Sequence, residues 1–144
     1  MEAFERAPPT AKLVIAGNAD HADEYVRTLM ARGSDRVIFT GSQDRRTLEA
    51  LYRNASLFVL PSAHEGLPIV VLEALGAGAP VLLSDISANK DIGLPARNYF
   101  VCRDVDALVS ALNTPHASYA ADRDAVLARF DWDAVAAQTL AIYE

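Results

Sequence analysis

The chain has 144 residues, which is enough for one domain with a hydrophobic core, and its hydrophobic content of 51% is typical of a globular protein. Its formal net charge of -6 argues against non-specific binding to nucleic acid or anionic lipid, because both require clustered Lys and Arg. The single cysteine excludes an internal disulfide and a cysteine-based zinc site. With neither a transmembrane run nor a signal-peptide pattern, we expect a cytoplasmic protein.

Five short apolar runs predict β-strands. Their apolar residues are mostly continuous rather than alternating, which is the pattern of strands buried on both faces of a parallel sheet. The expected strands are residues 12–16, 36–40, 56–60, 80–84 and 98–102.

Helical spacing of apolar residues fills the segments between these strands. Gly33 ends the first expected helix, Ser42 caps the second, Pro68 suits the first turn of the third, and Asp104 caps the fourth. Strands alternating with helices predict an α/β fold, a Rossmann-like, doubly wound parallel sheet with right-handed crossovers. The expected helices are residues 20–32, 42–54, 68–76, 105–113, 119–130 and 131–143.

The start of the chain departs from this alternation. A short helical stretch, residues 2–6, precedes two prolines and the first expected strand, whereas a doubly wound domain normally opens with a strand. We therefore interpret residues 1–144 as a single domain that lacks its first strand and is truncated at its N-terminal side. An unpaired sheet edge invites pairing with another chain, so we expect a homodimer through that edge.

Two glutamates mark the candidate site. Glu73 interrupts an apolar run, and because an unpaired buried carboxylate costs several kcal/mol, it faces either water or a polar partner. Glu65 lies eight residues earlier in a loop, where Gly66 lets a ligand approach the backbone. Free amides near Gly66, Leu67 and Ile69 are expected to point at a phosphate or at sugar hydroxyls. The alternatives are an exposed helix position for Glu73 and a helix-capping charge for Glu65.

The context of these glutamates resembles a known signature. Pro61-Ser62, residues 65–68, residues 72–74 and residues 78–81 together resemble family-4 retaining glycosyltransferases of the GT-B fold. The core of that signature is a Glu-x7-Glu motif, matched here by Glu65 and Glu73. The resemblance covers nearly the whole chain and corresponds to the C-terminal, nucleotide-sugar-binding domain of that fold.

The resemblance implies transfer of a hexose, with retention, from a nucleotide-diphospho-sugar to an acceptor in carbohydrate biosynthesis. It implies no cofactor and no essential metal. Glu65 would be catalytic and would hold the donor sugar or its phosphate, Glu73 would hold the ribose, and the full-length protein would be cytoplasmic or peripheral to a membrane. The remaining donor contacts would come from Gly66, Leu67 and Ile69 on the sugar and phosphates, and from Thr40, Gly41 and Ser42 near the base.

Three departures from the family pattern limit this interpretation. The family's diphosphate-gripping Arg and Lys, which follow the first strand, have no counterpart here, and neither has the N-terminal acceptor domain. Pro68 replaces a glycine and removes one amide from the loop. We therefore expect the isolated chain to be inactive. Two alternatives remain open: a non-catalytic interaction or regulatory module with a transferase-like fold, and a related GT-B sugar phosphorylase.

Overall fold

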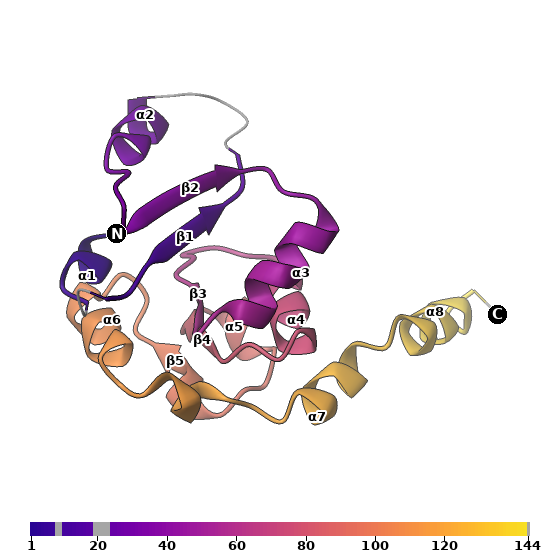
Figure 1. Cartoon of the computed structure of the whole chain (residues 1–144). Coiled ribbons are helices and arrows are strands. Elements are labelled where there is room, and N and C mark those ends of the chain that lie inside the picture. Colours follow the sequence, from indigo (N-terminus) through magenta and orange to yellow (C-terminus); the bar gives the residue numbers. More distant parts are fainter. Residues whose placement is uncertain (8–9, 19–23, 144) are drawn as a thin grey trace.

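A computed structural model describes residues 1–7, 10–18 and 24–143 (Figure 1). Its strands are all parallel and form two sheets, a two-stranded sheet β1-β2 and a three-stranded sheet β3-β4-β5. The α/β prediction with a parallel arrangement is confirmed, although the expected single sheet is divided into two. Of the strands that the structure describes, only β4 is paired on both sides, and β1, β2, β3 and β5 are each paired on one side. The strands are β1 (Leu13–Ala16), β2 (Val37–Gly41), β3 (Phe58–Leu60), β4 (Val81–Ser84) and β5 (Tyr99–Phe100).

Several helices begin where an acidic side chain accepts a hydrogen bond from a free amide of the first turn. Asp44, Asp104 and Asp122 each accept a hydrogen bond from the amide three residues further on. Helix α3 therefore begins after Asp44 rather than at Ser42, and the expected helix 119–130 is divided at Asp122. The helices are α1 (Glu2–Glu5), α2 (Glu24–Met30), α3 (Arg45–Asn54), α4 (Ile69–Gly76), α5 (Ser87–Lys90), α6 (Val105–Leu112), α7 (Arg123–Leu127) and α8 (Trp132–Leu140).

Three further details complete the secondary structure. Short 3-10 turns occupy Ala96–Asn98, His116–Tyr119 and Ala128–Phe130. The expected start of the first long helix, at residue 20, lies outside the described residues. Among the described residues, no helix combines the length and apolarity needed to cross a membrane.

Strand β4 is the centre of the core, and all four of its residues are buried. Val81 and Leu83 pack with residues of α4 and of the segment after α5, whereas Leu82 packs with Phe100 and Tyr119. Strand β1 differs, because its burial alternates along the strand and Val14 is 42% exposed. The predicted burial of every strand on both faces is thus correct for β4 and wrong for β1, which leaves one face open to water.

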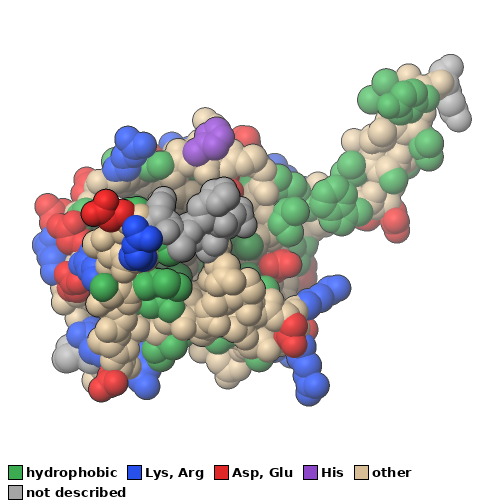
Figure 2. Space-filling view, turned by 90° about the horizontal axis from the view of Figure 1, so that it is seen from above, with side chains coloured by type: hydrophobic (Ala, Val, Ile, Leu, Met, Phe, Trp, Pro, Cys, Tyr) green, Lys and Arg blue, Asp and Glu red, His purple; other side chains and the backbone are tan. Residues whose placement is uncertain are grey.

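The C-terminal segment projects away from the body of the domain (Figure 1). Every residue from 131 to 143 is exposed, including Trp132 at 64%. Seen from above, the projecting arm carries apolar side chains along its length (Figure 2). Its exposed large apolar residues are Trp132, Val135, Leu140, Ile142 and Tyr143.

A glycine turn after α5 binds Arg129, which lies in the 3-10 turn that precedes the projecting segment. Gly93 has φ +76, and the guanidinium of Arg129 donates to the carbonyl oxygens of Ile92 and Asp91 at 3.2 and 3.3 Å. A Cβ atom at position 93 would lie 2.0 Å from Arg129 Nη1. The turn therefore accepts this arginine only because residue 93 has no side chain.

Replacing this glycine tests the contact. Gly93→Ala is expected to lower the free energy of unfolding by about 1–3 kcal/mol, because alanine is strained at positive φ and its methyl group displaces Arg129. Chemical denaturation measures the change. Gly76→Ala is the matched control, since a Cβ there meets nothing nearer than Leu127 Cδ1 at 4.0 Å. Equal stabilities for the two variants would contradict the role given to the turn.

Candidate functional site

The loop from β3 to α4, residues 61–68, holds Glu65. The hydroxyl of Ser62 donates a hydrogen bond of 2.6 Å to Glu65 Oε1, and the Glu65 side chain is half-buried. The chain passes into α4 through Pro68, which directly precedes the helix rather than lying in its first turn. Glu65 is thus held by a residue of its own loop, close to the start of α4.

The backbone around Gly66 is open to ligands. In the part of the chain that the structure describes, the amides of Gly66 and Leu67 donate to no partner, and a Cβ atom at Gly66 would meet nothing within 4 Å. The amide of Ile69 differs, because it donates to the carbonyl of Leu67 at 2.9 Å. Of the three amides expected to face a ligand, two are therefore available and the third is already used.

Glu73 lies on α4 and faces α3. Its carboxylate is exposed to water and accepts a hydrogen bond of 3.3 Å from the Tyr52 hydroxyl. Burial, followed by the negative charge of Glu73 and this hydrogen bond, raises the pKa of Tyr52 to about 12, so the phenol keeps its proton at neutral pH. A groove of about 450 Å³ is lined by Arg45, Leu48, Glu49, Tyr52, Glu73, Gly76 and Ala77.

Thr40, Gly41 and Ser42 lie where β2 ends and the chain turns toward α3. Gly41 has φ +67, and its carbonyl accepts a hydrogen bond of 2.9 Å from the amide of Gly17 after β1. The amide group of Gln43 donates to the Thr40 carbonyl at 2.6 Å, while Ser42 is exposed. The turn is therefore fixed by contacts with its neighbours.

The predicted site residues form two groups. Glu65 and its amides belong to the β3–α4 loop, while Glu73 is joined to α3, the helix that follows the turn at Thr40. Among the described residues, no hydrogen bond or ion pair joins Glu65 to Glu73. Helix α4 is the element that the two groups share.

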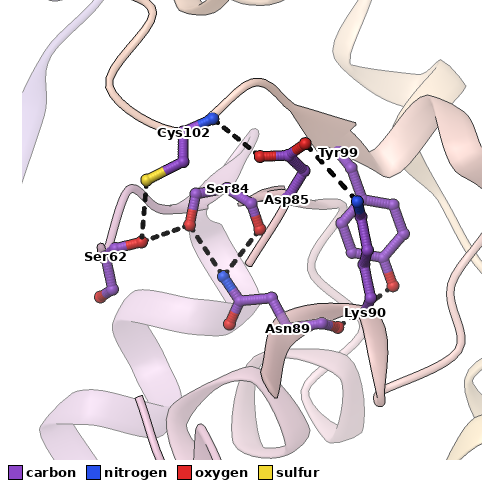
Figure 3. A network of polar contacts seen from close by, with 7 residues as sticks. All are labelled: Ser62, Ser84, Asp85, Asn89, Lys90, Tyr99 and Cys102. Carbon is purple, nitrogen blue, oxygen red and sulfur yellow. Dashed lines mark hydrogen bonds and ion pairs between the residues drawn. The ribbon is translucent and has the colours of Figure 1, made fainter. Parts of the chain in front are cut away.

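Beneath the Glu65 loop lies a polar network that the sequence did not predict (Figure 3). The buried Ser84 at the end of β4 donates from Oγ to the Ser62 carbonyl, and Asn89 Nδ2 donates to the same Oγ at 2.9 Å. Cys102 Sγ lies 3.8 Å from the Ser62 carbonyl oxygen. The contacts of Ser62 with Ser84 and Cys102 were not predicted because they join residues far apart in the chain, and Tyr52 was missed for the same reason.

Asp85 closes this network on the side of β5. The amide of Cys102 donates to Asp85 Oδ1 at 2.8 Å, and Lys90 Nζ lies 3.5 Å from Oδ2. The hydrogen bond from Cys102, assisted by the charge of Lys90, holds the pKa of Asp85 below its ordinary value, against the effect of burial. The ionised carboxylate thus fastens the segment after β5 to the end of β4.

Within the described residues, no group of three or more His, Cys, Asp or Glu side chains is placed to hold a metal ion. The implied independence of a metal and of a cofactor stays a prediction.

The sequence is similar to known glycosyltransferases over most of its length. Residues 1–116 match the family described as glycosyl transferases group 1. An uncharacterised glycosyltransferase of Methanocaldococcus jannaschii is 32% identical over 93% of the chain, and a glycogen synthase of Mycobacterium tuberculosis is 32% identical over 97%. The chain spans 37% of the first relative's length and 36% of the second's.

Solved structures match the fold over almost the whole chain. Sucrose-phosphate synthase from Thermosynechococcus elongatus superposes with a TM-score of 0.81 at 26% identity, covering 99% of this chain and 41% of that one. Anabaena HepE, solved in complex with UDP and glucose, superposes with a TM-score of 0.85 at 20% identity, covering 99% and 42%. These matches define the class of the domain as the C-terminal half of a GT-B glycosyltransferase. The chain belongs to the glycosyl transferases group 1 family.

The Asp85 contacts predict a dependence of stability on pH. Because the pKa of Asp85 is lower in the folded state, its stabilisation is complete above about pH 4 and is lost as the pH falls through the folded-state pKa. Asp85→Asn is expected to unfold at lower denaturant concentration than the parent chain at pH 7. The difference in stability should narrow as the pH falls from about 4 through the folded-state pKa, below which aspartic acid and asparagine are both uncharged. A difference that stays constant over this range would contradict the prediction.

Proposed function

We propose that this chain is the donor-binding domain of a retaining, family-4 glycosyltransferase of the hexosyltransferase type. The single observation that carries the proposal is the placement of one glutamate in the loop before α4 and of a second on α4 itself. Glu65, beside two free amides, precedes the start of α4, and Glu73 lies further along the same helix next to an open groove. In the relatives and neighbours, glycosyltransferase and synthase names, and a complex with UDP and glucose, agree with this chemistry.

Each end of α4 receives one part of the donor in this proposal. The amides of Gly66 and Leu67, together with the partial positive charge of the helix N-terminus, bind the sugar and diphosphate. Glu65 is the catalytic residue, and its Oε2 is the oxygen left for the sugar after Ser62 has bound Oε1. As diphosphate departs, negative charge grows on it, and these donors stabilise that charge.

The nucleoside lies against α3 and α4. Tyr52 donates to Glu73 Oε2, so the other oxygen of this carboxylate is available to accept from a ribose hydroxyl. Thr40, Gly41 and Ser42 lie near the base. Arg45, on the same groove, follows that turn and brings positive charge toward the nucleotide.

The transfer reaction as a whole is proposed for a protein that pairs this domain with an acceptor-binding domain, since the chain spans 36–37% of the two relatives. In this proposal the 144 residues alone hold the donor without transferring its sugar. The reaction needs no cofactor or metal. The protein is cytoplasmic or peripheral to a membrane.

The donor-site proposal predicts a loss of nucleotide binding on changing Glu73. The 144-residue chain is expected to bind at least one of UDP, GDP and ADP weakly, and Glu73→Ala to weaken that binding about 10- to 100-fold, because the ribose loses charge-assisted hydrogen bonds. Isothermal titration calorimetry measures both. Glu2→Ala, which removes an exposed carboxylate from α1, serves as the control. A folded chain that binds none of the three, or that binds equally after Glu73→Ala, would refute the donor site.

The unpaired sides of β1 and β3 support a second proposal, self-association through a sheet edge. Sedimentation velocity is expected to show concentration-dependent dimers. Val14→Lys should shift them to monomers, because charge on an edge strand opposes pairing, whereas Val101→Lys, at an exposed position outside the strands, should not. A monomer at all concentrations would exclude this dimer.

A further inference from the structure

We infer that Asn89 is a positioning residue for Glu65, acting through Ser84 and the backbone of Ser62; the inference rests on the proposed donor site. Asn89 lies on the four-residue helix α5 and is fully buried. No hydrogen bond joins the side chains of Asn89 and Glu65 in the described structure. Their connection runs through three hydrogen bonds in series. Figure 3 shows the first two, from Asn89 to Ser84 and from Ser84 to the Ser62 carbonyl.

The first bond sets the direction of the Ser84 hydroxyl. Asn89 Nδ2 lies 2.9 Å from both the carbonyl oxygen and the Oγ of Ser84. A carbonyl oxygen only accepts, so the group of Asn89 that faces Ser84 must be its NH₂ and not its oxygen. Ser84 Oγ therefore accepts from Asn89, and its own proton is directed elsewhere, toward the Ser62 carbonyl.

The second and third hydrogen bonds connect the Ser84 hydroxyl to the Glu65 carboxylate. Ser84 Oγ donates to the Ser62 carbonyl oxygen, which fixes the backbone of the loop from below. From that backbone, the Ser62 hydroxyl donates to Glu65 Oε1 at 2.6 Å. Because the hydroxyl and the carbonyl belong to one residue, a shift of the Ser62 backbone moves the donor that holds Glu65.

Asn89 is itself fixed on its other side. The Tyr99 hydroxyl donates to the backbone carbonyl of Asn89 at 3.2 Å, and it accepts from the backbone amide of Leu94 at 3.0 Å. The Asn89 Oδ1 atom is buried and has no partner among the described residues. A buried amide with an unpartnered oxygen lowers the stability of the core. This cost agrees with a role for the NH₂ group of Asn89 in fixing the Ser84 hydroxyl.

Asn98 provides a matched control in the same core. It is also fully buried and also leaves its Oδ1 atom without a partner among the described residues. Its Nδ2 donates to the carbonyls of Val81 and Tyr119, at 2.8 and 2.7 Å, and to none of residues 61–68. Removing either side-chain amide is expected to destabilise the core, but only the amide of Asn89 is connected to Glu65 by hydrogen bonds.

The test separates the sugar from the nucleotide. Calorimetry on the 144-residue chain compares UDP-glucose, GDP-mannose and ADP-glucose with UDP, GDP and ADP, and for the pair that binds gives the ratio of nucleotide Kd to nucleotide-sugar Kd. Asn89→Ala and Ser84→Ala are expected to lower this ratio about 5-fold or more, as Glu65→Ala does, with the nucleotide Kd changed less than about 2-fold. Asn98→Ala should lower the Tm and leave the ratio unchanged.

The remaining outcomes separate failure of the inference from failure of the proposed function. An unchanged ratio in Ser84→Ala, which keeps the bond from Asn89 to the Ser84 carbonyl and removes only the hydroxyl, overturns the inference even where Asn89→Ala does not fold. An equal loss in Asn98→Ala overturns it too, since general destabilisation then explains the effect. Absence of binding by the parent chain, or an unchanged ratio in Glu65→Ala, instead refutes the proposed function.

Discussion

Burial of β4 on both faces is the constraint on which the arrangement of this domain depends. The strand pairs with β3 on one side and β5 on the other, so the loops that follow all three strands start from fixed points. Its last residue, Ser84, is polar and as deeply buried as the leucines before it. Because a buried hydroxyl needs partners, the end of β4 organises the polar groups beneath the Glu65 loop.

Helix α4 explains how a glutamate occurs in an apolar run. Val71, Ala74 and Leu75 face the core and are buried, whereas Glu73 lies on the side that faces α3. Its neighbours Ile69 and Val70 are exposed at 53% and 39%, so the run is continuous in sequence but divided in space. The carboxylate therefore needs no burial, and its polar partner in the described structure is Tyr52.

Local signals in the sequence predicted much of the fold. The Asp104 cap, the end of α4 at Gly76 and all five strands follow from short-range patterns. The open face of β1 could not be predicted in this way, because a four-residue apolar strand has the same composition whether one or both of its faces are covered. Within the candidate site, Glu65 and Glu73 were predicted through their motif. Tyr52, the partner of Glu73, and the path from Asn89 to the Glu65 loop were not, because both depend on tertiary contacts.

The projecting helix α8 is expected to unfold locally more easily than the rest of the domain. With nine residues, the helix is shorter than an isolated helix needs to be to remain stable in water. All nine residues are exposed, so little burial offsets the entropy lost on ordering them. Local unfolding of this segment does not require any part of the β4 core to come apart. We therefore expect amide hydrogens from 132 to 140 to exchange with solvent through a low-energy local opening, and those of β4 to exchange through unfolding of the whole domain.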